Sequence, residues 1–243
     1  MKDKKQKILV LLDAHAVLHR AFHALPAFTS PNGELTGALY GFTTMLLKTI
    51  REFKPDYLAA CYDLPEPTFR HIAYEQYKGK RPKMDEGLAI QINRSRDILK
   101  VFGIPVYDAP GFEADDVLGT IAEQVGNFKS KTLKPKIIIA SGDLDTLQLV
   151  RNQDVVVYTL KKGIQDAVIY DEKGVKERFG FLPKFLPDFK GLKGDPSDNI
   201  LGVPGIGDKG ATELIQKFGG LEEIYRLLEK NEKKFLAAGF KQR

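Results

Sequence analysis

Short apolar runs alternate with longer amphipathic segments through the first two thirds of the chain. In the longer segments apolar residues recur at helical spacing, as from Leu39 to Phe53 and from Leu88 to Phe102. The short runs have the length and composition of buried strands. They are Ile8–Leu12, Tyr57–Tyr62, Ile104–Tyr107, Ile137–Ala140 and Val155–Tyr158. This alternation predicts an α/β fold with a mostly parallel central sheet and helices on both of its faces.

The pattern changes near residue 180. Beyond that point Gly and Pro punctuate helical segments, with apolar stripes over Ala211–Phe218 and Leu221–Leu228, and no further strand is expected. The sequence therefore predicts an α/β domain over residues 1–180 and a compact helical region over residues 181–243.

Composition narrows the class of protein. With 43% hydrophobic and 28% charged residues over 243 positions, the chain has the make-up of a soluble globular protein. Its single cysteine, Cys61, lies in an apolar run and is expected to be a core residue. No apolar stretch reaches the roughly 18 residues that span a bilayer, and the run Ile8–Leu12 is shorter than the roughly 7–15 residues of a signal-peptide core. These features predict a cytoplasmic protein with no membrane partner.

Acidic residues follow the predicted strands. Asp13 and Asp63 come directly after the first two strands, and Asp143 follows the fourth after Ser141 and Gly142. A further group, at the start of a predicted helix, consists of Glu113, Asp115 and Asp116. Because the carboxyl ends of parallel strands meet at one edge of a sheet, these acids are expected to converge there. Each acid taken alone could equally be a helix cap, a position that also favours acidic residues.

A cluster of carboxylates needs counter-charge. Two like charges about 4 Å apart repel by roughly 4 kcal/mol at an effective dielectric constant of about 20. An all-oxygen site without Cys or paired His ligands suits Mg²⁺ or Mn²⁺ rather than zinc. Two such ions roughly 3.5–4 Å apart would flank a phosphodiester, one activating water and the other stabilising the leaving oxygen. The acids therefore indicate a phosphoryl-transfer or hydrolysis site, and neither a GxSxG elbow nor a complete Walker A motif is present in the sequence.

Residues 68–83 combine cations with aromatic rings. The cations are Arg70, Lys78, Lys80, Arg81 and Lys83, and the rings are Phe69, Tyr74 and Tyr77. Cations that bind phosphates and flat rings that stack on bases suit single-stranded nucleic acid. The alternative is an ordinary solvated surface segment. The net charge of the whole chain, +5, is modest, so it is the position of this segment, close after Asp63, that favours the functional interpretation.

A glycine-rich segment, GVPGIGDKG, runs from Gly202 to Gly210. It matches GxGxxG, but no strand precedes it, so a dinucleotide site is not expected. We interpret Gly202, Gly205 and Gly207 as a tight hairpin between two helices, whose exposed amides would bind a backbone phosphate of nucleic acid. A helix–helix turn without a ligand is the alternative.

Together these segments resemble the 5′→3′ exonuclease domain of bacterial DNA polymerase I, within the wider flap-endonuclease family of 5′ nucleases. The resemblance rests on LLDAHAVLHRAFHAL, CYDLPEPTFRHIAYEQYKGKR, GFEADD, SGDLDTLQL and GLKGDPSDNILGVPGIGDKGA, which occur in the family's order over nearly the whole chain. It implies a resolvase-like (PIN-like) catalytic domain, a helical arch over about residues 68–102, and a C-terminal helix–three-turn–helix region with a helix-hairpin-helix motif. The family domain normally continues for further helices, so we expect this chain to be truncated relative to the family, as a free-standing nuclease, a truncated gene or a fragment.

The resemblance also implies roles for individual residues. The family's metal-site carboxylates match Asp13, Asp63, Glu113, Asp115, Asp116, Asp143, Asp145, Asp195 and Asp198. We expect Asp13, Asp63, Glu113, Asp115 and Asp143 to serve the metal nearest the attacked phosphate, and Asp145, Asp195 and Asp198 to lie further out. The family's catalytic basic residues around the scissile phosphate match Arg20, Lys78 and Arg81. Its DNA-binding residues match Arg70, Gly205, Gly207 and Lys209. The last three lie in a hairpin where family members also hold K⁺.

The activity implied is that of a structure-specific 5′→3′ exonuclease and flap endonuclease that uses two or more Mg²⁺ or Mn²⁺ ions. Its DNA substrates would be 5′ flaps, nicked or gapped duplexes and RNA-primed ends, cleaved to a 5′-phosphate and a 3′-hydroxyl during DNA replication and repair. A DNA polymerase acting on the same intermediates is the implied protein partner, and a monomer in the bacterial cytoplasm, associated with the nucleoid, is expected. Two alternatives are a PIN-type ribonuclease, which would need neither hairpin nor arch, and a non-catalytic DNA-binding paralogue, which would have no reason to keep all nine carboxylates.

Overall fold

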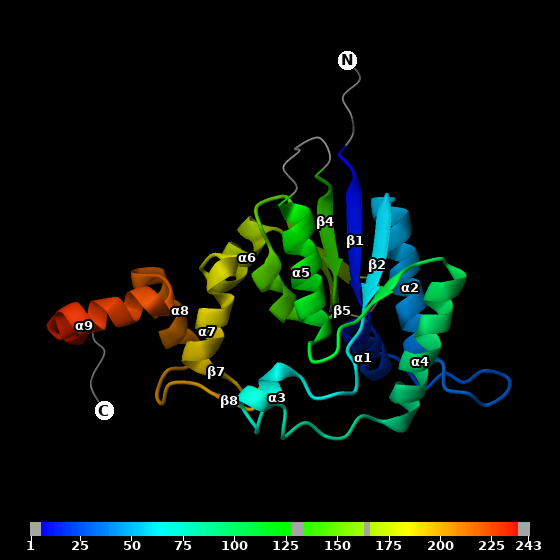
Figure 1. The fold of residues 1–243 in the computed structure, drawn as a ribbon, viewed down its shortest axis with the longest axis horizontal. Coiled ribbons are helices and arrows are strands. Elements are labelled where there is room, and N and C mark those ends of the chain that lie inside the picture. Colours follow the sequence, from blue (N-terminus) through cyan, green and yellow to red (C-terminus); the bar gives the residue numbers. More distant parts are fainter. Residues whose placement is uncertain (1–5, 128–133, 163–165, 238–243) are drawn as a thin grey trace, which may run out of the picture.

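Six strands form the central sheet of the structure, a computed structural model that describes residues 6–127, 134–162 and 166–237. The strands are β1 (Ile8–Asp13), β2 (Tyr57–Cys61), β3 (Val106–Tyr107), β4 (Lys136–Ala140), β5 (Val155–Lys162) and β6 (Asp166–Tyr170). They lie in the order β3-β2-β1-β4-β5-β6, and every neighbouring pair from β3 to β5 is parallel (Figure 1). The predicted α/β class with a mostly parallel sheet is confirmed.

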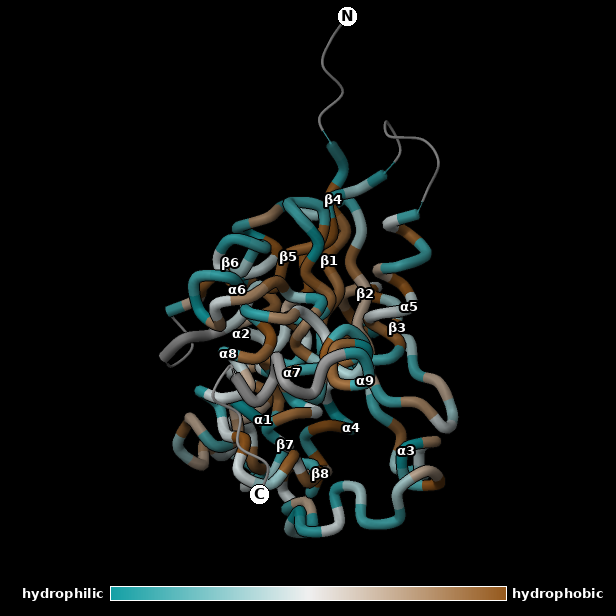
Figure 2. Tube along the Cα trace, turned by 90° about the vertical axis from the view of Figure 1, so that its left-hand side faces the viewer, coloured by the Kyte–Doolittle hydropathy of each residue, from teal (hydrophilic) through white to brown (hydrophobic). Residues whose placement is uncertain are grey.

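Helices cover both faces of this sheet. They are α1 (Ala14–Ala24), α2 (Gly37–Phe53) and α4 (Glu86–Val101) on one face, and α5 (Ala114–Gly126), α6 (Glu172–Phe179) and α7 (Leu186–Lys193) on the other. Alternate residues of a strand point to opposite sides, so Val10 and Leu12 pack with the first set of helices and Leu9 and Leu11 with the second. Figure 2 shows the apolar residues gathered along the strands between these two layers. Cys61 is fully buried, as predicted, and burial raises the pKa of its thiol to about 12.

Two features differ from the sequence prediction. β6 is an antiparallel strand at the edge of the sheet, although no strand is predicted between Tyr158 and residue 180. The strand has a short apolar run over residues 167–170, but Ile169 within it is 45% exposed, as expected for a strand at the edge of the sheet. β7 (Gly194–Asp195) and β8 (Ile200–Leu201) form a small antiparallel pair where only helices are predicted. Strands of two residues are too short to show a hydrophobic period.

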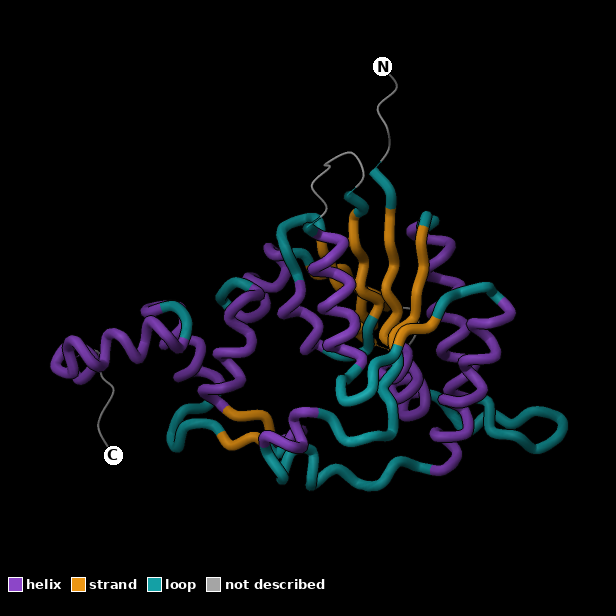
Figure 3. Tube along the Cα trace, in the orientation of Figure 1, coloured by secondary structure: helices purple, strands orange, loops and turns teal. Residues whose placement is uncertain are grey.

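The chain between β2 and α4 contains one short helix, α3 (Phe69–Ala73), followed by an irregular stretch over residues 74–85. Figure 3 shows this stretch as a loop that runs from α3 to α4. Its first part, residues 74–81, is called the basic loop below, and residues 194–201, which include β7 and β8, are called the acidic turn. The two lie side by side, and the Lys78 amide donates a hydrogen bond to the Asp198 carbonyl at 3.0 Å (Figure 1).

The last part of the described chain is helical. Helix α8 (Asp208–Phe218) packs on the same core as α7 through Ala211, Leu214 and Ile215, and α9 (Leu221–Ala237) follows it. The glycine-rich segment joins β8 to α8, so it lies beside the acidic turn in the chain. Of the helices in the described ranges, none combines the length and the apolar character needed to cross a membrane.

Candidate active site

A cleft of about 1010 Å³ lies at the carboxyl ends of the parallel strands. Seven of the nine predicted metal-site acids line it, namely Asp13, Asp63, Glu113, Asp115, Asp143, Asp145 and Asp198. The predicted catalytic cations Arg20, Lys78 and Arg81 line it as well. The structure therefore brings together residues that are up to 185 positions apart in the chain, at the sheet edge where the sequence predicts them to meet.

Helix capping fixes several of these acids in place. Asp13 ends β1 and caps α1, accepting a hydrogen bond from the Ala16 amide at 3.0 Å. Asp143 accepts one from the Asp145 amide at 2.9 Å. The alternative interpretation of these acids as caps is thus correct for Asp13 and Asp143, and the same side chains line the cleft. Capping and site formation are compatible because a cap lies where a strand ends and a helix begins.

Four of the acids, Asp13, Asp63, Asp115 and Asp143, are called the inner acids below, and the other five are called the outer acids. Two further hydrogen bonds hold inner acids in place. Asp63 Oδ1 accepts from the Ala114 amide at 2.7 Å, which ties the end of β2 to the start of α5. The hydroxyl of Ser141 donates to Asp13 Oδ2 at 2.6 Å, and Ser141 is fully buried. Sequence reasoning missed Ser141, because its only signal is its position between the fourth strand and Asp143.

The charges of the inner acids oppose one another. Burial, followed by the charges of Asp13, Asp143, Asp63 and Asp145, raises the pKa of Asp115 well above its usual range. Asp13 is 3% exposed, and burial raises its pKa to about 6 despite its hydrogen bonds from Ser141 and Ala16. Both shifts have the direction that burial and neighbouring negative charge give to a carboxyl group.

The outer acids, in contrast, are paired with cations of the chain. Lys78 Nζ lies 2.7 Å from Glu113 Oε1, and Arg81 Nη2 lies 2.5 Å from Asp198 Oδ1. Glu113, which is expected to serve the metal nearest the attacked phosphate, is paired with Lys78 in this structure, so it is grouped with the paired acids.

Asp116 and Arg70 form another outer pair, outside the cleft lining. Arg70 donates two hydrogen bonds to Asp116, at 2.6 and 2.8 Å. Burial alone would raise the pKa of Asp116, but these bonds hold it below its usual range. The two residues are thus engaged with each other rather than with the centre of the cleft.

Lys190 of α7 is a site residue that the sequence analysis missed. Its ammonium group contacts both Asp145 and Asp195, the latter at 2.6 Å, and the residue lines the cleft. Asp195 does not line the cleft itself. Burial raises the pKa of Asp195, but the hydrogen bonds from Lys190 and Ser197 outweigh it and lower the pKa to about 2. A single lysine in a helix gives no sequence signal of such a bridge, since it depends on packing between α7 and the strand edge.

The sequence pattern suggests that Tyr77 is an exposed ring that could stack on a base, but the structure shows it buried. It is 6% exposed, and its hydroxyl lies 3.1 Å from Glu113 Oε2 and 3.2 Å from Asp198 Oδ2. Burial and the neighbouring carboxylates raise its pKa. Phe69 and Tyr74 are 45% and 37% exposed, so these two rings remain accessible.

The glycine hairpin and Lys209 lie outside the cleft lining. A side chain on Gly202 would meet the carbonyl carbon of Lys193 at 2.2 Å, and Gly205 has a φ of +84°, so packing and backbone conformation explain these two glycines. Neither explains Gly207, the N-cap of α8, which has an ordinary φ of −102° and open space around it. Open space over a helix N-terminus is what close approach of a phosphate requires.

The inner acids fit a hard divalent cation in charge and donor type. They offer only oxygen donors, and the pKa values of Asp13 and Asp115 are raised first by burial and then by neighbouring carboxylates, whose negative charge a cation would balance. Within the described ranges, no three His, Cys, Asp or Glu side chains already stand in an arrangement that could hold a metal ion. A metal ion bound among these acids would require their carboxylates to move closer together.

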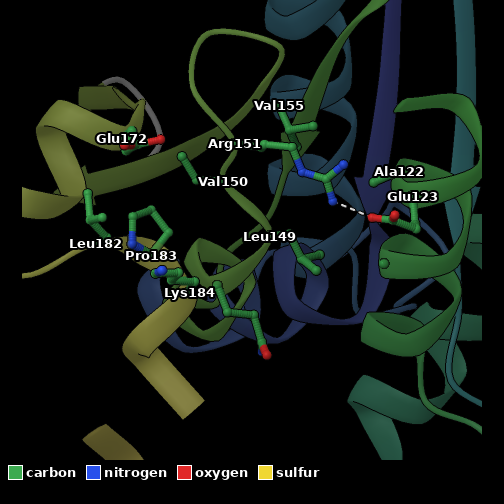
Figure 4. Close-up of a pocket in the computed structure, with 12 residues that line it drawn as sticks. Ala122, Glu123, Leu149, Val150, Arg151, Val155, Glu172, Leu182, Pro183 and Lys184 are labelled. Carbon is green, nitrogen blue, oxygen red and sulfur yellow. Dashed lines mark hydrogen bonds and ion pairs between the residues drawn. The ribbon is translucent and has the colours of Figure 1, made fainter. Parts of the chain in front are cut away.

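A second cavity, of about 350 Å³, lies between α5, β5 and α6 (Figure 4). The Glu123–Arg151 ion pair lies at its wall. Its described lining includes none of the predicted site residues. The acid cleft is therefore the candidate active site.

Comparison with known proteins gives the family. A model of the 5′-3′ exonuclease N-terminal resolvase-like domain matches residues 8–180, and a model of the 5′-3′ exonuclease C-terminal SAM fold matches residues 181–242. The chain belongs to the 5′-3′ exonuclease family. Its similarity to DNA polymerase I of Caldicellulosiruptor bescii is 43% identity over 225 residues, or 91% of this chain and 26% of that protein. The 5′-3′ exonuclease of Aquifex aeolicus is 38% identical over 229 residues, or 94% of this chain and 76% of that protein.

A solved structure shows the same fold. The flap endonuclease of bacteriophage T5, in a pseudo-enzyme-product complex with DNA and metal ions, superposes with a TM-score of 0.71 at 21% identity, over 91% of this chain and 79% of that one. The resemblance to the 5′-3′ exonuclease family and the resolvase-like fold are thus confirmed. The chain spans about a quarter of the length of the DNA polymerase I relative, 26%.

Replacing Asp115 by Asn should stabilise the metal-free protein, because it removes a carboxyl group whose ionisation is opposed first by burial and then by the neighbouring acids. In EDTA at pH 7 the Tm should rise, by about 2–4 °C for each kcal/mol of repulsion removed. Mg²⁺ should raise the Tm of the variant less than that of the wild type. Thermal unfolding with and without Mg²⁺ measures both effects, with Asp166→Asn, an exposed acid on β6, as the control.

The Tm difference between Asp115→Asn and the wild type should also depend on pH. An acid whose pKa is raised in the folded state adds stability below its ordinary value of about 4 and loses that contribution as the pH rises through the folded-state value. For Asp13 the folded-state pKa is about 6. The Tm advantage of Asp115→Asn should therefore be smallest near pH 4 and should grow toward pH 7. A variant less stable than the wild type in EDTA at pH 7 would contradict this account of the site.

Proposed function

We propose that this chain is a divalent-metal-dependent, structure-specific 5′ nuclease that hydrolyses DNA phosphodiesters at 5′ flaps and RNA-primed ends. The observation that carries the proposal is the division of the acids in the cleft. Inner carboxylates repel one another, and outer carboxylates are paired with the cations of the basic loop. Carboxylates that suit a metal cation, next to positively charged side chains, fit a phosphodiester substrate.

The metal ligands proposed are Asp13, Asp63, Asp115 and Asp143, with Glu113, Asp116, Asp145, Asp195 and Asp198 as further ligands or as acids that orient them. Mg²⁺ or Mn²⁺ matches the all-oxygen donor set, and two or more ions match the number of acids. A bound ion would supply Lewis-acid stabilisation of negative charge on the phosphate. The T5 flap endonuclease complex, which has the same fold, contains metal ions and DNA, and this supports the proposal.

The chain's own groups position the substrate. Arg20, Lys78 and Arg81 line the cleft beside the acids, and Arg20 is held by a hydrogen bond to the Gly142 carbonyl at 3.3 Å. When phosphate enters, Lys78 and Arg81 can exchange their carboxylate partners for phosphate oxygens. They would then stabilise the charge that develops during cleavage, and the released carboxylates would become available to metal.

DNA duplex would bind at the glycine hairpin. The open space over Gly207, together with the amides at the start of α8, offers a phosphate site, and Lys209 adds a cation on the same turn. A K⁺ ion at this hairpin, and a contact of Arg70 with DNA after release from Asp116, belong to the same proposal. We also propose residues 1–180 as the catalytic domain and residues 181–243 as the DNA-binding region.

The biological setting follows from this activity. We propose a role in DNA replication and repair, acting as a monomer on nicked, gapped and flapped intermediates that a DNA polymerase also uses. A bacterial, nucleoid-associated location is part of the proposal.

The proposed activity is tested with a 5′-labelled flap duplex in Mg²⁺ and in EDTA. Mg²⁺ should permit cleavage near the flap junction and leave a 3′-hydroxyl, while EDTA should abolish cleavage and leave binding within several-fold. Cleavage of single-stranded RNA in preference to the flap would favour a PIN-type ribonuclease. Binding without cleavage in Mg²⁺ or Mn²⁺ would favour a non-catalytic paralogue, and either outcome would contradict the proposal.

The basic loop and the hairpin should act at different steps. Lys78→Ala should slow single-turnover cleavage at saturating enzyme by at least about tenfold with little loss of binding, because Lys78 lies at the acids. Lys209→Ala should weaken binding and reduce the dependence of log K on log salt by about one unit, because Lys209 lies outside the cleft lining and its proposed contact is with the DNA backbone alone. Equilibrium binding and single-turnover cleavage of both variants provide the test. Slow saturated cleavage by Lys209→Ala with intact binding would show that the hairpin lies at the chemistry.

A further inference from the structure

The basic loop and the acidic turn are joined by side chains as well as by the Lys78–Asp198 backbone hydrogen bond. Asn199 lies at the centre of this contact and is 8% exposed. Its Nδ2 donates to the Gln76 carbonyl at 2.9 Å, and its own carbonyl accepts from the Tyr74 hydroxyl at 3.1 Å. Asn199 therefore bonds to the loop through both its side chain and its backbone.

The Gln76 carbonyl is also part of the turn that presents Lys78. It accepts a second hydrogen bond, from the Gly79 amide at 3.0 Å, which closes a tight turn over residues 76–79. Lys78 lies in this turn with a φ of +55°, a conformation that costs energy for a residue with a side chain. The Asn199 amide thus supports the carbonyl that holds Lys78 in an unfavourable conformation, with its ammonium group on Glu113.

The backbone of Asn199 fits this task. Its φ and ψ are 58° and 29°, in the left-handed region that Asn tolerates better than most residues. The conformation follows from the 3-10 turn over Pro196–Asp198, whose last hydrogen bond is from the Asn199 amide to the Pro196 carbonyl at 3.2 Å. The residue that ends this turn therefore directs its amide toward the basic loop, directly after Asp198.

We propose that Asn199 is a positioning residue for the nuclease reaction, which couples the acidic turn to the basic loop and thereby places Lys78 and Arg81 at the cleft. This inference rests on the proposed function for its effect on cleavage. Asn199 carries no charge, and its side chain touches no proposed metal ligand. Its effect on the reaction would therefore be transmitted through the basic loop.

Asn199→Gly is the informative variant, because glycine adopts the left-handed conformation freely and removes only the amide. Asn152→Gly is the matched control, since Asn152 has a φ of +49° and is exposed in a turn before β5. A hydrogen bond is worth about 1 kcal/mol, so single-turnover cleavage at saturating Mg²⁺ should fall by roughly five- to tenfold in Asn199→Gly. Asn152→Gly should cleave at the wild-type rate, and flap binding should stay within several-fold in both.

Asn199→Asp distinguishes the effect of losing the hydrogen bond to the Gln76 carbonyl from the effect of changing the backbone conformation. Aspartate also tolerates the left-handed conformation, but its ionised carboxylate cannot donate to the Gln76 carbonyl. It should therefore slow cleavage at least as much as Asn199→Gly. Rates equal to the wild type in both variants would overturn the inference.

A double-mutant cycle with Lys78→Ala tests the route of the effect. If Asn199 acts by placing Lys78, then Asn199→Gly should change the rate of Lys78→Ala less than it changes the rate of the wild type. Fully additive losses would overturn the inference, because they would mean that Asn199 acts independently of Lys78.

Trypsin cleavage provides a readout that needs no nuclease activity. In the metal-free protein, trypsin cleavage after Lys78 and Lys80 should be several-fold faster in Asn199→Gly than in the wild type or Asn152→Gly, because the loop loses a hydrogen bond to the acidic turn. Equal rates would overturn the inference. If the wild type fails to cleave a flap but the trypsin difference is present, the proposed function fails while the coupling of loop and turn stands.

Discussion

Repulsion among carboxylates at the edge of a parallel sheet is the constraint on which this structure depends. Asp13, Asp63, Asp115 and Asp143 are held where three strands end, and the pKa values of Asp13 and Asp115 are raised by burial and by neighbouring acids. Such a group is unfavourable in the absence of counter-charge. The chain meets this cost only in part, since Lys78, Arg81 and Lys190 pair with the outer acids, and the proposed metal ion would supply the counter-charge for the inner group.

The ion pairs between these cations and the outer acids link the fold to the proposed reaction. Lys78, Arg81 and Lys190 each come from a segment outside the strands, and each contacts an acid next to the inner group. In the metal-free state these contacts hold the basic loop and α7 against the sheet edge. Metal would bind the carboxylates of these pairs and phosphate would bind their cations, so binding of either one should favour binding of the other. The tie through Asn199 would keep the loop close while its cations change partners.

Much of this arrangement could be predicted from the sequence. The buried strands have apolar runs, and parallel strands bring residues such as Asp13, Asp63 and Asp143 to one edge whatever the details of packing. Contacts that depend on docking of distant segments could not be predicted. Lys190 has no motif, and the burial of Tyr77 arises from a contact with Asp198, 121 positions away. The strands β7 and β8 were not predicted because two residues are too few to show a hydrophobic period. The edge strand β6 was not predicted although its residues 167–170 are apolar, because a run of four residues is a weak signal on its own.

The location of a bound ion tests the central claim most directly. A crystal structure of the wild-type protein soaked in Mn²⁺, with anomalous difference density recorded at the manganese edge, would place the ion without reference to activity. The account predicts density among Asp13, Asp63, Asp115 and Asp143, with these carboxylates drawn closer together than in the metal-free protein. Density found only at Glu113, Asp116 or Asp198, with the four inner acids unmoved and metal-free, would contradict it.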